Sequence, residues 1–134
     1  MNPITDLDLL LWTMEPVLQP GIFVFASLGA GVTVDPALVL ASIQEPEGLS
    51  VVMRESDARR YNLHILFRCA WITLSVHSDL QAIGLTAAFA TALADAAISC
   101  NVVAGAYHDH IFVPIRAAEK AMQVLRSLQK RKSK

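Results

Sequence analysis

Apolar and polar residues alternate strictly from Ala70 to His77. Ile72, Leu74 and Val76 share one face of an extended chain, and polar or aromatic residues occupy the other face. A period of two, together with β-branched and aromatic residues, is typical of a β-strand with one buried face. We therefore predict a strand over this segment.

The spacing becomes helical from Gly84 to Ala97. Leu85, Phe89 and Leu93 recur every fourth residue within an alanine-rich stretch. Alanine is the best helix former, and apolar residues at this spacing form one face of a helix. The pattern predicts an amphipathic helix that packs closely on a sheet.

The rest of the second half continues in the same style. We expect strands over Ser99–Ala106 and His110–Ile115, a turn at Tyr107–Asp109 between them, and a closing helix over Arg116–Lys130. The order β-α-β-β-α is that of a ferredoxin-like fold, with helices on one face of an antiparallel sheet.

The first half repeats part of this pattern. Strands are predicted over Ile22–Leu28 and Leu49–Arg54, with a helix over Ala37–Ile43 between them. Asp35 and Pro36 suit the cap and first position of that helix. This β-α-β unit aligns, at one fixed offset, with the β-α-β unit that begins near Trp71. Few residues are identical in the alignment, so the alternative is that the likeness is a coincidence. We predict an α+β protein of two pseudo-repeated halves, residues 1–66 and 67–134.

Two further segments of the first half show a weaker hydrophobic pattern. The run Leu7–Met14 is predicted as another strand, and Ser56–Leu63 as a short helix or loop that joins the halves.

Composition narrows the class of protein. At 134 residues the chain suits one compact domain or two very small ones that share a core. Hydrophobic residues make up 54% of it, and the formal net charge is −1. A nearly neutral, apolar chain is not drawn to nucleic acid or to a membrane surface, and it tends to self-associate. We expect a homodimer, and a protein partner is compatible with the same surface.

The cellular location is predicted from three features of the sequence. The most apolar stretch, Ala82–Ile98, is interrupted by polar residues and falls short of a membrane span. The first residues do not resemble a signal peptide. Cys69 and Cys100 are far apart in the sequence and suit free thiols in a reducing compartment. We predict a cytoplasmic protein.

Two clusters of polar residues have the composition of a metal site or a catalytic triad, but their spacing does not support either function. His108, Asp109 and His110 have no further ligand at motif spacing, so a structural turn is favoured over a metal site. The adjacent residues 77–79 name a hydrolase triad, but consecutive side chains diverge and a triad must converge. No nucleophile or phosphate-binding motif is present. We expect no enzyme activity, no cofactor and no metal.

Several segments of the second half resemble a known protein family. The run His77–Thr86, the alanine-rich helix and the segment Ile98–Gly105 resemble the ACT domain. The continuation Tyr107–Pro114 resembles the free-standing bacterial tandem-ACT proteins, and the eukaryotic arginine-sensing CASTOR proteins carry similar modules. The likeness covers about residues 68–128 closely and 7–56 by pattern. No strand is predicted after the last helix, so the fourth strand of the usual fold is missing unless Leu7–Met14 or the first half supplies it.

The resemblance implies a regulatory fold that binds amino acids or similar metabolites where two ACT modules meet. In the family, the loop after the first strand, the start of the first helix and the second strand form the pocket. Carried over by position, this implies a ligand site made of nine residues: His77, Ser78, Asp79, Ile83, Gly84, Leu85, Thr86, Asn101 and Val102.

Elementary physics supports such a site. A helix that begins at Gly84 presents unpaired backbone N–H groups and a positive dipole end to a carboxylate. Asp79 is suited to an ammonium group, and Asn101 both donates and accepts. The alternative is that Ser78 and Asp79 only cap the helix.

The sequence thus leaves two main hypotheses of different kinds, beside a third and less favoured one, an enzyme with an unfamiliar site. In the first, the protein is a non-catalytic sensor that binds an amino acid or similar metabolite. In the second, it is an assembly module that dimerises through the same fold without any small-molecule ligand.

Overall fold

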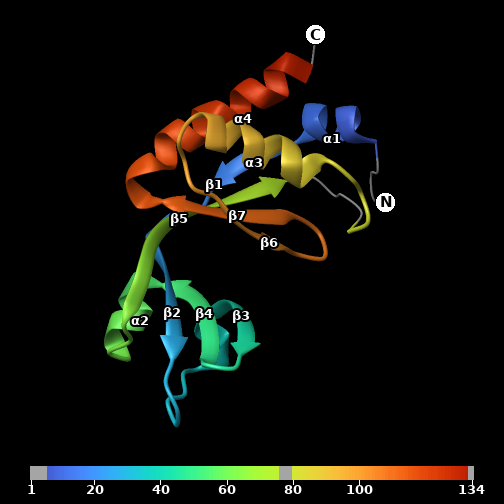
Figure 1. The fold of residues 1–134 in the computed structure, drawn as a ribbon. Helices are drawn as coiled ribbons and strands as arrows, with labels where there is room; N and C mark the ends of the chain where they lie inside the picture. The colour runs from blue at the N-terminus through green and yellow to red at the C-terminus, as the bar shows by residue number, and fades with distance from the viewer. Residues whose placement is uncertain (1–5, 76–79, 133–134) are drawn as a thin grey trace.

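The computed structural model describes residues 6–75 and 80–132 as one curled antiparallel sheet with helices packed on it (Figure 1). The sheet has the strand order β3-β4-β2-β5-β7-β6, and β1 pairs with β5. The strands are β1 (Glu15–Leu18), β2 (Phe23–Leu28), β3 (Val39–Glu45), β4 (Gly48–Arg54), β5 (Ile65–Ser75), β6 (Asn101–Ala104) and β7 (Asp109–Pro114). The helices are α1 (Leu7–Thr13), α2 (Glu55–Arg60), α3 (Leu85–Asp95) and α4 (Ala118–Lys132), with short 3₁₀ turns η1 (Pro36–Leu38) and η2 (Ile115–Ala117). The predicted α+β class, with antiparallel pairing, is confirmed.

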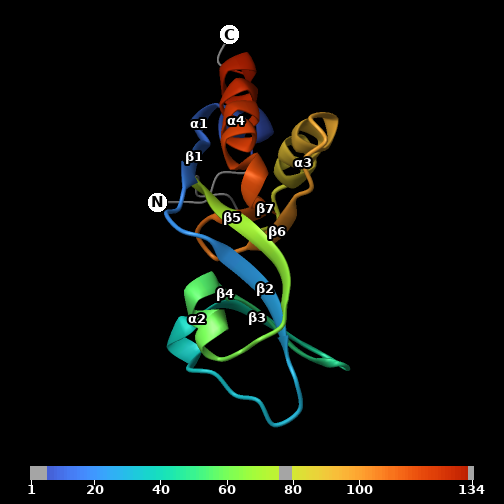
Figure 2. The same cartoon turned by 90° about the vertical axis from the view of Figure 1, so that its left-hand side faces the viewer.

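The long strand β5 joins two lobes of similar construction (Figure 2). Its first part pairs with β2, its last part pairs with β1, and β7 lies along its other edge. We call β2, β3, β4 and α2, with the first part of β5, the N-terminal lobe. The C-terminal lobe comprises the last part of β5 with β6, β7, β1, α1, α3 and α4. The strand order is β3-β4-β2-β5 in the N-terminal lobe and β6-β7-β5-β1 in the C-terminal lobe. Strands β5, β6, β7 and β1 of the C-terminal lobe thus occupy the positions of β2, β3, β4 and β5 in the N-terminal lobe, although β1 comes first in the chain.

The prediction of a strand over Leu7–Met14 is wrong, because this segment forms helix α1. The side chain of Asp6 accepts a hydrogen bond from the Leu9 amide at 3.0 Å and caps the helix. Leu10, Leu11 and Met14 are buried, which is a helical spacing. The fourth strand that the C-terminal lobe needed is supplied by the first half after all, by β1, which follows this helix.

The prediction of a helix over Ala37–Ile43 is also wrong. Only the turn η1 forms there, and the chain continues as β3 in a hairpin with β4. Gly48 closes the hairpin at φ +150°, and a Cβ atom at this position would lie 2.6 Å from the Leu28 carbonyl oxygen. The glycine therefore lets β4 turn back beside β2. The repeat is one of strands, and the first lobe lacks the helix of the second.

The other elements follow the predictions with shifted ends. The predicted strand from residue 70 begins earlier, at Ile65, and residues 76 and 77 lie outside the described part. The joining segment is helix α2, where Glu55 forms ion pairs with Arg59 and Arg68. These ion pairs hold the pKa of the Glu55 carboxyl below its usual value, chiefly through the hydrogen bond from Arg68.

The core is divided by the sheet. In the C-terminal lobe, Ile72 and Leu74 pack against Phe89 and Leu93 of α3, and α1 and α4 complete the cluster. In the N-terminal lobe a smaller cluster lies under Ala58 of α2. Aromatic side chains fill the opposite, concave face, where no helix lies among the described residues. None of the described helices is long and apolar enough to cross a membrane.

Candidate functional site

The structure gathers only part of the predicted ligand site. His77, Ser78 and Asp79 lie outside the described residues. Gly84, Leu85 and Thr86 line one small pocket. The remaining three do not line it: Ile83 is 87% exposed, Asn101 is exposed, and Val102 is half-buried on β6.

This pocket lies at the start of α3, beside the hairpin of β6 and β7. Its volume is about 120 Å³, and it is lined by Leu80, Ala82, Gly84, Leu85, Thr86, Ala104 and Asp109. A water molecule occupies roughly 30 Å³ in the liquid, so the pocket has room for the charged end of a small molecule.

The start of α3 supplies one pole of the pocket. Gly84 adopts a left-handed conformation at φ +103°, and within the described residues no side chain caps the helix. Ser78 and Asp79, the candidate caps in the sequence, lie outside those residues. The first hydrogen bond of the helix runs from the Ala88 amide to the Gly84 carbonyl oxygen at 2.9 Å. The amides of residues 85–87 therefore have no acceptor within the described part of the chain. Free amides and the helix dipole make this end electropositive.

Asp109 supplies the opposite pole. It is the first residue of β7, where it pairs with Ala104 and Leu74, and the residue as a whole is only 8% exposed. Over residues 6–75 and 80–132, no side chain forms a hydrogen bond or an ion pair with its carboxylate. Burial raises the pKa of Asp109 above its ordinary value, and the neighbouring His110 and His108 partly offset this. A carboxylate on a largely buried residue favours a cationic group beside it.

The sequence interpretation missed Asp109 by assigning it to a turn, although a signal was available. Along β7, Asp109 is in phase with Ile111 and Val113, and both of these are fully buried. An acidic residue in register with two core positions is a candidate for a buried functional carboxylate. The signal was masked by the histidines on either side.

The same alternation separates His110 from the pocket. On the concave face, the Trp71 indole N–H donates to His110 Nδ1 at 3.1 Å, and Thr73 Oγ1 lies 3.1 Å from the same nitrogen. Gln19 donates to Thr73 at 3.0 Å. Burial lowers the pKa of His110 below its usual value, which favours the neutral ring that these contacts require. Within the described residues, no group of three or more metal-ligating side chains comes together.

The two cysteines are not reactive groups of a site. Cys69 and Cys100 are both free, as predicted. Burial raises the pKa of Cys69 to about 12 and that of Cys100 to about 11. Both therefore stay protonated near neutral pH, where the thiolate is the nucleophilic form.

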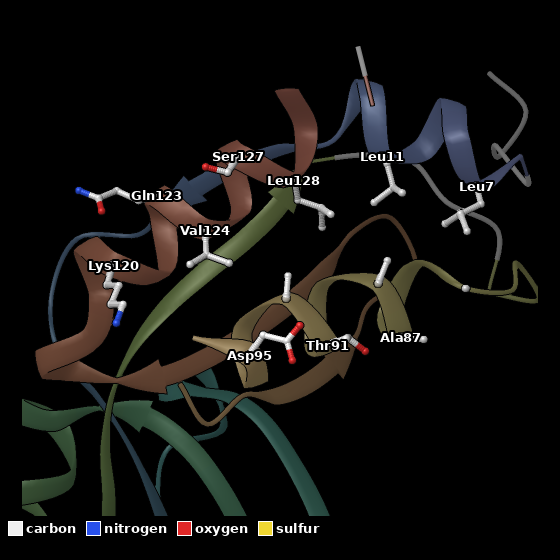
Figure 3. A pocket seen from close by; sticks show the side chains of 13 residues that line it. Leu7, Leu11, Ala87, Thr91, Asp95, Lys120, Gln123, Val124, Ser127 and Leu128 are labelled. Atoms are coloured by element: carbon white, nitrogen blue, oxygen red, sulfur yellow. The ribbon is translucent and has the colours of Figure 1, made fainter. Parts of the chain in front are cut away.

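A larger groove of about 820 Å³ runs between α3 and α4 (Figure 3). Its floor is apolar, with Leu7 and Leu11 of α1 at one end. The polar residues along it, Thr91, Asp95, Lys120, Gln123 and Ser127, are all exposed. An exposed polar group is already hydrated and gains little from a ligand, so the smaller pocket with its buried carboxylate is the better candidate.

Two family models identify the class of protein. One for the ACT domain matches residues 2–70, and a second for the ACT domain matches residues 66–127. The chain therefore belongs to the ACT domain family, and it carries two ACT modules in tandem. The matches overlap within β5, the strand that the two lobes share.

The fold of the chain is similar to those of several solved structures. A protein of unknown function from Vibrio cholerae, described as a possible transport protein, is 44% identical over 92% of this chain and 95% of its own, with a TM-score of 0.81. An Agrobacterium tumefaciens protein is 16% identical over 87% of this chain and 89% of its own, with a TM-score of 0.69. The regulatory subunit of aspartate kinase from Thermus thermophilus shares the fold at 12% identity and a TM-score of 0.64, over 87% of this chain and 96% of that subunit. No curated protein matches the sequence.

Proposed function

We propose that this protein is a non-catalytic regulator that binds an amino acid or a similar small zwitterion in the pocket between Asp109 and the start of α3. The observation that carries the proposal is that the carboxylate of Asp109, a residue only 8% exposed, shares one small pocket with the start of α3. Among the described residues, neither this carboxylate nor the amides at the helix start have a hydrogen-bond partner. An ammonium group at Asp109 and a carboxylate at the amides of residues 85–87 would satisfy both poles.

The family supports a regulatory role, and the state of the cysteine and histidine side chains supports a non-catalytic one. The cysteine thiols are protonated, and His110 is held in a structural network on the opposite face of the sheet. The free thiols also suit a reducing compartment, so we place this function in the cytoplasm.

We further propose that the protein works as a homodimer, with the ligand bound where ACT modules of two copies meet. The chain exposes 8056 Å², whereas a compact monomer of 14.6 kDa exposes about 6900 Å². Leu80 at the pocket is 70% exposed, and Ile83 and Tyr107 are also strongly exposed. The same surface favours the second candidate, an assembly module that uses the fold only to pack subunits.

A thermal-shift screen against the standard amino acids at millimolar concentration tests the proposal and separates the two candidates. A binder present at about 100 times its dissociation constant adds roughly 2.7 kcal/mol to the free energy of unfolding. We expect one or a few amino acids to raise the melting temperature of the wild-type protein. Asp109→Asn removes the buried charge and should abolish the shift, whereas Asp95→Asn, at an exposed site on α3, should retain it.

Two results would contradict the proposal. A flat response to every amino acid, with a dimer seen by sedimentation, supports the assembly module instead. An equal shift for the wild-type and Asp109→Asn proteins places the ligand elsewhere.

A further inference from the structure

The two lobes differ at one corresponding place. In the C-terminal lobe, the connection from the first strand to the second contains α3, which covers the helix side of the sheet. In the N-terminal lobe, the same connection is residues 29–38, and its only helical part is the turn η1. Figures 1 and 2 show α2 as the helix of this lobe, where the other lobe has both α3 and α4.

The place without a helix is an apolar groove of about 540 Å³. Leu28, Val39 and Leu49, which belong to or pack on the core of this lobe, also line the groove. Val32 and Leu40 line it too, and each is 42% exposed. Exposed apolar side chains that line a groove are typical of a protein-interaction site.

The matching surface in the other lobe shows what such a face accepts. There, Leu85, Phe89 and Leu93 of α3 are at most 3% exposed against the sheet. They recur every fourth residue, so one face of a single helix covers the strands. The N-terminal lobe has strands in the same order but supplies no such helix from its own connection.

Charge around the groove selects among partners. Residues 29–53 contain three carboxylates, Asp35, Glu45 and Glu47, and no lysine or arginine precedes Arg54 in the chain. Asp35 lies next to Pro36 in the groove wall, and the two glutamates flank the hairpin turn. The segment that forms the groove therefore carries only acidic charges, whereas the arginines of this lobe lie at the end of β4, on α2 and on β5 (Arg54, Arg59, Arg60 and Arg68). An acidic groove segment favours a cationic partner over an anionic one.

We propose that this groove binds an amphipathic, cationic helix of a partner protein, in the position that α3 occupies in the other lobe. The apolar face of that helix enters the groove, and its lysine or arginine residues face the acidic rim. This surface is separate from the pocket at Asp109, and it gives a regulator a place through which to act on another protein.

A designed peptide serves as the probe. It is a fluorescent helix of about four turns with leucine at every fourth position and lysine on its outer face. Fluorescence anisotropy with the full chain should show saturable binding in the micromolar range. Raising the salt from about 0.05 to 0.5 M should weaken binding, and a peptide with glutamate in place of lysine should not bind.

Variants locate the binding surface. Leu40→Gln and Val32→Gln each remove an apolar contact at a partly exposed position and should weaken peptide binding about fivefold. Ile43→Gln is the matched control, because Ile43 lies on the same strand, is 68% exposed and does not line the groove. It should leave the affinity unchanged. Melting temperatures identify any variant that fails to fold, and the two groove variants are independent of each other.

Three outcomes would overturn the proposal: no binding of the cationic peptide, equal binding of the anionic peptide, or equal affinity of the Leu40→Gln, Val32→Gln and Ile43→Gln proteins. A dimer that Leu40→Gln dissociates would assign the groove to a second copy of this chain and would overturn it as well.

Discussion

Consecutive residues of β7 act on opposite faces of the sheet. Asp109 faces the pocket at the start of α3, and His110 faces Trp71 on the concave side. Because side chains alternate along a strand, a cluster of three titratable residues in the sequence becomes two separate environments. This is the physical reason that the Asp109 and His110 side chains do not converge on one point.

The Asp109→Asn variant should make the ligand-free protein more stable near neutral pH. Burial raises the pKa of Asp109, so the folded protein binds a proton there more tightly than the unfolded chain does. Stability from this group is gained as pH falls through the raised pKa, and the ionised form is unfavourable above it. Thermal melts at about pH 7 and pH 4 should show a higher melting temperature for the variant at the first and a smaller difference at the second. A lower melting temperature for the variant at both values would mean that the carboxylate has a stabilising partner.

His110 predicts the opposite trend with pH. Its pKa is lowered by burial, so between that value and the ordinary 6.5 the unfolded chain binds the proton more readily. The stability that the neutral ring contributes is present above pH 6.5 and is lost as pH falls through the lowered pKa. Urea unfolding at about pH 8 and pH 5.5 measures this. His110→Gln should reduce the difference between the two values, while His64→Gln, at an exposed site, should not.

At the scale of elements, the start of α3 carries the site and is built around a glycine. Gly84 has φ +103°, and an added Cβ atom would lie 2.9 Å from Leu7 Cδ2. Helix α1 therefore packs directly on the turn that opens the pocket. Residues 7–14, predicted as a strand, therefore help to form the site as a helix, through the contact of Leu7 with Gly84.

Gly84→Ala should destabilise the protein by about 1–2 kcal/mol, through backbone strain and the contact with Leu7. Gly29→Ala is the control, because Gly29 has no positive φ and its nearest neighbour is 3.9 Å away. Chemical denaturation measures both variants. Equal stability of the two would contradict the strained conformation at residue 84.

Periodicity predicted the elements from β5 to α4, but it failed at α1, β1 and β3, where contacts with distant parts of the chain determine the structure. The alternation before Ser75 and the four-residue spacing in α3 were sufficient. The segment Ala37–Ile43 was mistaken for a helix because its Asp-Pro start is genuine: Asp35 does cap η1. The hairpin that continues from it depends on Gly48 lying against the Leu28 carbonyl, a contact between distant residues that no local pattern contains.

The site was predictable in part for the same reason. The start of α3 follows from the glycine at residue 84, which the sequence displays, and within the described residues the amides of residues 85–87 have no acceptor. Asp109 joins them only because the hairpin of β6 and β7 folds beside α3. The contribution of residues 77–79 stays a prediction.

At the scale of the whole molecule, the two lobes are interlocked through β5 and through the N-terminal segment. Helix α1 and strand β1 come first in the sequence but belong to the C-terminal lobe. The predicted boundary between residues 66 and 67 falls inside β5, and the division into two units there stays a prediction.

A fragment of residues 67–134 should therefore not fold alone. It lacks Leu10, Leu11 and Met14, which are at most 1% exposed in the C-terminal core, and the strand that pairs with the end of β5. Circular dichroism should show no cooperative unfolding of the fragment. Addition of a peptide of residues 6–18 should restore a transition. Cooperative unfolding of the fragment alone would contradict the interlocked arrangement.

The central claim is that the amides at the start of α3 and the Asp109 carboxylate bind one zwitterion together. A ¹⁵N–¹H NMR titration with pools of the standard amino acids tests it most directly. The account predicts saturable shifts of the Leu85, Thr86 and Ala87 amide signals for the wild-type protein and none for Asp109→Asn. Amide signals at these residues that stay fixed for every pool, or that move equally in the variant, would contradict it.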